Sequence, residues 1–386
     1  MKGECAVELR KFSIPEIIFG QGSLRYAGRC ARRLGAEKVF VVSDPGLEYV
    51  GWVDRLTETL AEEKLRWVYF NDIVSNPRDF QVERGAAIYK EEEADVVIAL
   101  GGGSPMDAAK GIALVASNGG SIHDYEGANR IRRPLPPMVF IPSTAGSGSD
   151  LTQFCIITDV RRKVKMSIIS RSLVPNISII DPLLLQTKTK NLIIASGIDA
   201  LAHAIESYVS KIATPFTELQ SLQAIRLIFE HLEAALETRS LDCLQQLSTA
   251  STAAAMAFSN AGLGADHALA HSLGGMFDTL HGLVHPVLLP PVMRFNLREC
   301  VEKMANIGEV ILNKKIRPRE AMALAGIEKL SEYCESLQVN NHLREIVDDP
   351  CRLPELCKMA LNDACLLTNP RAASAEDLLR ICEEAW

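Results

Sequence analysis

The chain has 386 residues, 47% of them hydrophobic, and its 41 basic and 48 acidic side chains give a formal net charge of −7. A chain of this length can bury a large core, and length alone favours two or three domains. The absence of a basic block argues against a nucleic-acid partner. The N-terminal MKGECAVELRKF lacks the apolar stretch of a signal peptide, and no apolar run approaches the ~20 residues that span a bilayer.

Ten cysteines are scattered along the chain without a C-x-x-C pair. In a long chain without a secretion signal, scattered cysteines are typically buried apolar residues in a reducing compartment. Their spacing does not favour a thiolate metal site. We therefore expect a cytoplasmic protein that interacts with neither membranes nor nucleic acids.

The first half of the chain alternates strand-like and helical segments. In chain order these are a strand at 38–42, a helix at 53–64, a strand at 65–70, a helix at 79–93, a strand at 94–100, a helix at 106–117 and a strand at 138–141. Such alternation is typical of βαβ units and a parallel sheet. The run VVIAL at 96–100 is continuously apolar, as expected for a strand covered on both faces.

The second half, from about residue 191, has helical periodicity and almost no strand signal. Helices are expected at 195–211, 221–238 and 251–262, with Gly262 as a stop. The sequence thus predicts an α/β domain at 1–185 and a helical domain at 186–386. Ligands in such folds favour the carboxyl ends of the strands and the cleft between domains.

A glycine loop, Gly101-Gly102-Gly103-Ser104-Pro105, joins the predicted strand 94–100 to the next helix. Glycines let backbone N–H groups approach a phosphate, and the helix directs its unpaired N–H groups and positive dipole end at the anion. A plain tight turn is the alternative, but the strand before and the helix after favour phosphate binding. The loop matches neither G-x-x-x-x-G-K-S/T nor G-x-G-x-x-G, which argues against a nucleotide triphosphatase and an ordinary Rossmann domain.

Two further polar segments follow predicted strands. Asp44 follows strand 38–42 and could bind a ribose 2′-hydroxyl, favouring NAD over NADP, or simply begin an Asp-Pro-Gly turn. The segment 143–150, which begins Ser143-Thr144, offers hydroxyl and backbone donors to an anion. Helix capping by Ser149 or Asp150 is an alternative or additional role for its end.

Histidines cluster in the helical half. Asp199 and His203 are four residues apart, as are His267 and His271, so each pair shares one helix face; His281 and His285 follow. Any one of these residues alone would be an ordinary core or surface histidine. Together with a buried aspartate that needs a partner, they favour a bound Fe²⁺ or Zn²⁺. The absence of thiol partners argues against a structural zinc site.

Four ordered motifs resemble those of the iron-containing (group III) alcohol dehydrogenases, and the resemblance covers nearly the whole chain. They lie at 101–110, 143–150, 197–206 and 264–296. The resemblance implies a Rossmann-like α/β domain with a parallel sheet, followed by an all-α domain, the dehydroquinate synthase-like architecture. It also implies NAD(H) as cofactor, Fe²⁺ or possible Zn²⁺ in the cleft, and a homodimer or larger homo-oligomer.

The resemblance assigns roles to particular residues. It implies metal ligation by Asp199, His203, His267 and His281, while His271 lies near the metal without ligating it and is the candidate catalytic proton relay. The positions that it places around the dinucleotide are Asp44, Asn76, Gly101, Gly102, Gly103, Ser104, Ser143, Thr144, Thr152, Phe154, Lys165 and Leu184.

The chain departs from the family pattern at His285, where members often carry asparagine; this imidazole could change substrate preference or compete for metal. Ser143 and Ser147 replace commonly seen threonines, a milder change. The expected reaction is hydride transfer between NAD(H) and a small primary alcohol or aldehyde, with the metal acting as Lewis acid. The alternatives on the same scaffold are a hydroxyacid–oxoacid transhydrogenase and a lyase like dehydroquinate synthase. Few basic residues flank the histidines, which argues against the lyase.

Overall fold

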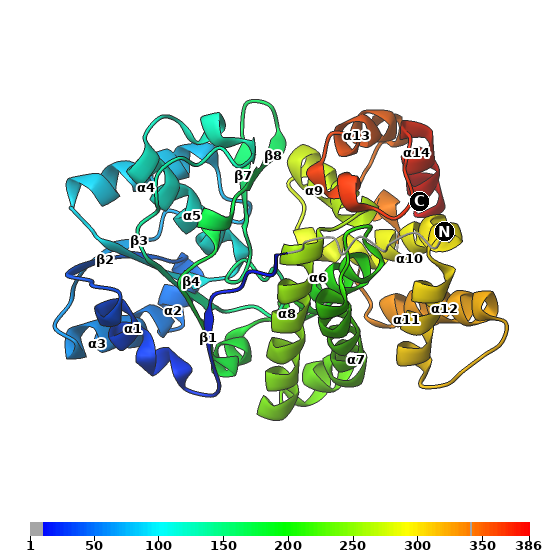
Figure 1. Cartoon of the computed structure of the whole chain (residues 1–386), viewed down its shortest axis with the longest axis horizontal. Coiled ribbons are helices and arrows are strands. Elements are labelled where there is room, and N and C mark those ends of the chain that lie inside the picture. The colour runs from blue at the N-terminus through cyan, green and yellow to red at the C-terminus, as the bar shows by residue number, and fades with distance from the viewer. Residues whose placement is uncertain (1–10, 340–341) are drawn as a thin grey trace, which may run out of the picture.

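The computed structural model describes residues 11–339 and 342–386. A six-stranded, fully parallel sheet forms the centre of the N-terminal half (Figure 1). Its strand order is β1 (Glu16–Phe19), β9 (Ile177–Ile180), β6 (Met138–Pro142), β4 (Val96–Gly101), β2 (Lys38–Val42) and β3 (Arg66–Phe70). Of the ten cysteines, Cys5 lies outside the described residues.

Helices cover both faces of this sheet. On one face lie α1 (Ala27–Arg33) and α3 (Trp52–Glu62), and on the other α4 (Asp79–Glu91) and α5 (Gly103–Asn118). The central strand β4 explains why the run at 96–100 is continuously apolar. Val97 and Ala99 pack toward α4 and α5, whereas Ile98 and Leu100 pack toward α1 and α3. The prediction of a strand buried on both faces is confirmed.

A second, small sheet was not predicted from the sequence. It contains β5 (Gly127–Ala128), β8 (Val164–Ile169) and β7 (Phe154–Asp159), and β7 and β8 pair antiparallel as a hairpin. In β8 the buried Met166 and Ile168 alternate with the partly buried Lys165 and Ser167, a strand pattern that sequence reasoning missed. Strand β7 begins with four apolar residues in a row, FCII, which gives a weaker signal. The hairpin lies between the main sheet and the helical half (Figure 1).

The C-terminal half is helical, as predicted. Its helices are α6 (Lys190–Val209), α7 (Pro215–Thr238), α8 (Leu241–Ala261), α9 (Ala265–Phe277), α10 (His285–Asn296), α11 (Val301–Leu312), α12 (Arg319–Ser336), α13 (Leu353–Ala360) and α14 (Ala375–Glu384). Helix α8 ends before Gly262, whose φ of 72° suits glycine, so the predicted stop is confirmed. Helix α6 is long and apolar enough to cross a membrane, but 89% of its apolar window is buried inside the fold.

The predicted helices are real, but three of them begin earlier than expected. Helices α6, α7 and α8 start after Thr189, Thr214 and Ser240, and each of these side chains accepts a hydrogen bond from a backbone N–H three residues ahead. Such N-caps fix a helix start. Hydrophobic periodicity begins only where the helix reaches the core, so it placed the starts too late.

Candidate metal and cofactor site

A cavity of about 840 Å³ lies between the two halves of the molecule. The loops after β2, β4 and β6 and the β7–β8 hairpin line one side, and helices α6, α8 and α9 line the other. The carboxyl ends of parallel strands are the usual binding edge of an α/β sheet. The cavity therefore lies where the sequence predicted a ligand site.

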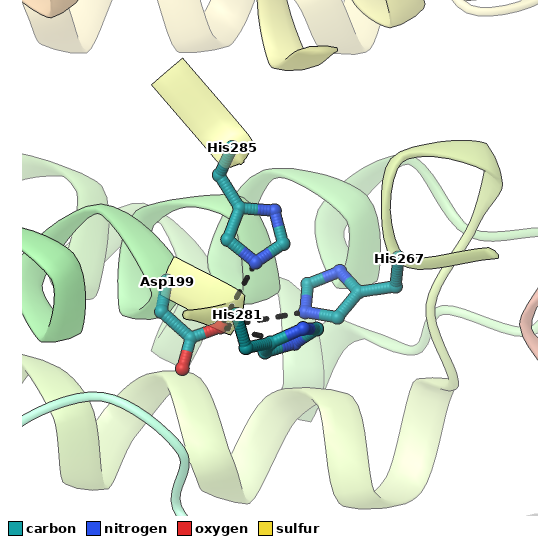
Figure 2. A group of neighbouring side chains, drawn as sticks. All are labelled: Asp199, His267, His281 and His285. Atoms are coloured by element: carbon teal, nitrogen blue, oxygen red, sulfur yellow. Dashed lines mark ion pairs between the residues drawn. The ribbon is translucent and has the colours of Figure 1, made fainter. Parts of the chain in front are cut away.

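Four side chains converge on one point at the helical side of this cavity. Figure 2 shows Asp199 from α6, His267 from α9, His281 from η5 (His281–Leu283) and His285 from α10 directed toward one another. Their potential ligand atoms all lie within 4.8 Å of one another. The Oδ1 of Asp199 is 3.6 Å from His267 Nε2, 3.8 Å from His281 Nε2 and 3.2 Å from His285 Nε2.

His203, the remaining predicted ligand, lies at the margin of this group. Its Nε2 is 3.7 Å from Asp199 Oδ1, as the four-residue spacing on α6 predicts. Its ring stacks on Phe258 at 4.0 Å and on His267 at 4.4 Å between centroids. The structure thus brings together all four predicted ligands and adds His285.

The buried polar atoms at this point lack partners. Asp199 Oδ1, His267 Nε2 and His285 Nε2 are buried without a hydrogen bond. Leaving such groups unpaired in a protein interior is costly unless something binds them. Carboxylate and imidazole are ligands suited to Fe²⁺ and Zn²⁺. The donor set therefore fits a divalent metal ion.

Three histidine rings in and beside this cluster contact a carboxylate through Nδ1, the nitrogen that faces away from the cluster. The Nδ1 of His267 is 2.7 Å from Glu206 Oε2, that of His285 is 2.5 Å from Asp266 Oδ2, and that of His271 is 2.8 Å from Asp363 Oδ2. Such contacts orient an imidazole and leave Nε2 free to bind, which is how metal-ligating histidines are usually held.

Burial and neighbouring charges shift the titration of these groups. Burial opposes protonation of His267, but contacts with Asp199 and Glu206 prevail and raise its pKa to about 10. In the same way Asp266 and Asp199 overcome burial and raise the pKa of His285 to about 9. Burial alone would raise the pKa of Asp199, yet the surrounding imidazoles hold it well below the usual range. The buried carboxylate of Asp199 thus favours positive charge at this point, which a divalent cation also supplies.

The glycine loop forms the opposite side of the cavity. Gly102, Gly103 and Ser104 line it at the start of α5, beside Ser143 and Thr144 of the loop after β6. A side chain at Gly103 would meet Ser147 at 3.1 Å, so glycine keeps the two loops close. The N-terminus of α5 opens into the cavity, as phosphate binding requires.

Two predicted cofactor positions do not line the cavity. Gly101 lies below the loop, where its carbonyl accepts a hydrogen bond from Ser143 N at 2.7 Å, and a side chain there would strike Pro105. Leu184 is completely buried in the core beneath the sheet. Gly101 thus supports the loop through its backbone, and Leu184 is part of the core.

Asp44 begins the Asp-Pro-Gly turn that was one of its two possible roles. Its side chain accepts a hydrogen bond from Leu47 N at 3.0 Å and caps α2 (Pro45–Tyr49), while the residue also lines the cavity. Asn76 lines the cavity too, with its amide donating to Asp278 of the helical half at 2.8 Å. The two readings of Asp44 are therefore compatible in this structure.

The remaining predicted cofactor positions lie at or beside the hairpin. Thr152, Phe154 and Lys165 line the cavity, and buried Lys110 from α5 holds the first two in place. Its ammonium donates to Phe154 O at 2.6 Å and to Thr152 O at 2.9 Å. Lys110 belongs to the motif at 101–110, and its observed contacts give it a positioning role.

The proposed helix cap at the end of the second loop is wrong. No helix begins at 149–150, because the chain turns there into the hairpin. Ser149 instead donates to Asp107, and Asp150 accepts a hydrogen bond from Ser178 Oγ at 2.6 Å. These side chains tie the loop to α5 and β9, so sequence alone mistook tertiary contacts for local capping.

Sequence reasoning missed the three carboxylates behind the histidines. Glu206 lies seven residues after Asp199, two turns along α6, so helical spacing could have indicated it. Asp266 directly precedes His267, which gives no face relationship. Asp363 is 92 residues from His271 in sequence, and only the fold brings them together.

Comparison with known proteins identifies the family. The family model for iron-containing alcohol dehydrogenase matches residues 15–182, and the C-terminal model of the same family matches residues 193–386. The chain belongs to the iron-containing alcohol dehydrogenase family. It is 37% identical to the 1,3-propanediol dehydrogenase of Klebsiella pneumoniae, over 97% of this chain and 98% of that protein.

Other relatives agree with this assignment. The chain is 36% identical to the NAD-dependent methanol dehydrogenase of Bacillus methanolicus, over 97% of this chain and 99% of that protein. A crystal structure of 1,3-propanediol oxidoreductase superposes with a TM-score of 0.95 at 36% identity, covering 98% of this chain and 100% of that one. The predicted fold class and the predicted class of enzyme, an alcohol/aldehyde oxidoreductase, are confirmed. These relatives do not support the transhydrogenase or lyase alternatives.

Proposed function

We propose that this iron-containing alcohol dehydrogenase interconverts a small primary alcohol and its aldehyde with NAD(H), at a divalent metal held by Asp199, His203, His267 and His281. The observation that carries the proposal is the group of buried, unpartnered donor atoms at one end of a cavity. The other end of that cavity is lined by a glycine loop and a helix N-terminus. One cavity thus offers places for both cofactors side by side.

The bound metal, Fe²⁺ or Zn²⁺, supplies Lewis-acid chemistry toward the substrate oxygen, and the nicotinamide supplies or accepts the hydride. The protein provides the setting for both. Glu206 fixes the ring of His267, and Phe258 stacks on His203, so these two rings have little freedom to turn. Fixed rings keep the donor atoms in place for repeated turnover.

The dinucleotide is proposed to lie along the cavity from Asp44 to the histidines. Gly102, Gly103 and Ser104 would face its phosphates, with the α5 N-terminus contributing its dipole. The carboxylate of Asp44 at the rim would bind ribose hydroxyls and repel a 2′-phosphate, which favours NAD over NADP.

We propose His271 as the proton relay. Asp363 holds its Nδ1 at 2.8 Å, which leaves Nε2 free to exchange a proton within the cavity that His271 lines. Its ring also stacks against that of His281 at 5.3 Å between centroids. A proton held at His271 Nε2 therefore lies close to the proposed reaction centre.

The substrate class, location and assembly complete the proposal. The apolar side chains of Phe258, Leu263 and Leu367 line the cavity on the helical side, which suits a short alcohol or diol such as those named for the relatives. We propose a cytoplasmic location, which the nine free cysteines among the described residues support. We also retain the predicted homo-oligomer and the division into domains 1–185 and 186–386.

The proposal is tested with protein purified without air, stripped by a chelator and reloaded with Fe²⁺. NADH absorbance is followed with formaldehyde, 3-hydroxypropanal and lactaldehyde. We expect NADH oxidation that depends on metal, and a His267→Ala variant that loses both bound metal and at least about 100-fold in rate. Equal activity in the stripped protein would contradict the metal role.

The control is His231→Asn, a partly buried histidine on α7 outside the cluster. It is expected to keep its metal and its activity. Turnover between an alcohol and a second carbonyl compound without added NADH would instead favour the transhydrogenase.

A further inference from the structure

His285 is the histidine nearest to Asp199. Its Nε2 lies 3.2 Å from Asp199 Oδ1, whereas the four-donor prediction uses three histidines at 3.6 to 3.8 Å. Figure 2 shows its ring directed at the same oxygen as those of His267 and His281. By position, His285 is therefore placed at least as well to bind a shared ion as any of the predicted ligands.

The support behind His285 repeats that behind His267. In each case a buried carboxylate, Asp266 or Glu206, contacts Nδ1, and the buried Nε2 on the other side has no hydrogen-bond partner. Asp266 is itself fixed, because its backbone N–H donates to Glu206 Oε1 at 2.7 Å. An imidazole held in this way presents Nε2 as a ligand atom.

Direct contact with substrate does not explain His285. The side chains of His203, His267, His271 and His281 line the cavity, but that of His285 is completely buried behind them. It is the first residue of α10, and Pro286 in the first turn favours this helix start. The ring of His285 can therefore act on the reaction only at the point where its Nε2 meets Asp199.

We infer that His285 is a fifth protein ligand of the metal ion, with Asp266 as its positioning residue. This inference rests on the proposed metal centre. Structural zinc sites take four protein ligands and catalytic zinc usually three, so five protein donors exceed the four positions of a tetrahedral ion. Octahedral ions such as Fe²⁺, Co²⁺ or Mn²⁺ accept five and keep a place for a substrate oxygen. The extra donor thus selects against zinc as the working metal.

Cobalt(II) is the probe, because its visible absorption reports coordination number as well as binding. Stripped wild-type protein, His285→Asn and the double variant Asp266→Asn/His285→Asn are titrated with Co²⁺ against a competing chelator. The double variant removes the buried carboxylate together with its partner, so it avoids an unpaired charge. His231→Asn is the matched control.

We expect one Co²⁺ per chain in every protein. Both variants that lack His285 should bind it at least about tenfold more weakly than wild type, with a more intense visible band that indicates fewer ligands. Unchanged affinity and spectrum would overturn the inference, and tighter binding would identify His285 as a competitor for the carboxylate. A wild-type protein that binds no Co²⁺ would instead overturn the metal centre itself.

A measurement on the wild type does not depend on how the variants fold. In the NMR spectrum of the Co²⁺-loaded enzyme, imidazole N–H protons of ligating histidines are shifted far from the ordinary range. The inference requires four such resonances, from His203, His267, His281 and His285. Three would overturn it.

Discussion

At the scale of single residues, Lys165 lines the cavity and interacts electrostatically with Asp199, a proposed metal ligand. Burial lowers its pKa to about 8, although Asp199, Asp278 and Asp107 act in the opposite direction. It lines the cavity next to the proposed dinucleotide path. A cation in this place attracts an anionic cofactor, and its charge titrates close to physiological pH.

NADH binding is accordingly expected to depend on pH. Because the pKa of Lys165 is lowered to about 8, the side chain is charged below that pH and loses its proton above it. NADH should therefore bind with constant affinity below pH 8 and up to about tenfold more weakly per pH unit above it. Lys165→Met should weaken binding at pH 7 by roughly tenfold or more and abolish this dependence. NADH fluorescence titrations from pH 7 to about pH 9.5 measure both effects.

Lys163→Met is the matched control, since it removes an exposed lysine two residues earlier on the same hairpin. It should bind NADH as the wild type does at every pH. A pH profile that persists unchanged in Lys165→Met would assign the titration to another group.

Residue chemistry was also the part of the site that the sequence could predict. Asp199 and His203, or His267 and His271, share a helix face whatever the fold, so spacing alone paired them. The contact of Asp363 with His271 and that of Asp266 with His285 depend on how α9, α10 and the segment after α13 pack. No local pattern encodes such contacts, so they could not be predicted before the fold was known.

At the scale of elements, the β7–β8 hairpin reaches across to the end of α9. Two adjacent glycines of α9 make this approach possible. A side chain at Gly275 would meet Lys163 O at 2.8 Å, and one at Gly274 would meet Lys165 Nζ at 2.6 Å. The hairpin brings Phe154 and Lys165 to the cavity, so its distance from α9 affects the shape of the proposed cofactor site.

Alanine at the two glycines should give different results. Gly275→Ala collides with hairpin backbone and should lower the free energy of unfolding by about 1–3 kcal/mol, despite the better helix propensity of alanine. Gly274→Ala collides with the flexible end of Lys165, which can move aside, so stability should change little while NADH binding weakens. Urea unfolding and NADH titration of both variants make the comparison. A Gly275→Ala variant as stable as the wild type would show that the hairpin yields readily.

Element prediction succeeded where an element has a pattern of its own. The run at 96–100 and the helices of the second half were predictable because burial imposes a continuous or helical apolar pattern. The edge strand β1 and the strand β9 have only four residues each, too few for a clear pattern. Their structure comes from their neighbours in the sheet, which one segment of sequence does not reveal.

At the scale of the whole molecule, the two proposed cofactors belong to different halves. The proposed metal ligands all come from α6, α9, η5 and α10, in the helical half. The glycine loop and Asp44 belong to the α/β half, and side-chain contacts such as that of Asn76 with Asp278 join the two halves. Metal should therefore stabilise the helical half directly, and NADH should act mainly on the other half and on the contact between them.

Metal removal is expected to lower thermal stability. A ligand present at 100 times its dissociation constant stabilises the folded state by about 2.7 kcal/mol, which corresponds to about 5–10 °C for a domain of this size. Calorimetry of Fe²⁺-loaded and chelator-treated protein measures the difference. Asp199→Asn removes the negative charge at which the ligand atoms converge, so this variant should melt at the same temperature with or without Fe²⁺. If the wild type were equally insensitive, the buried unpartnered atoms would have to be satisfied by something other than a metal ion, and the centre would need another explanation.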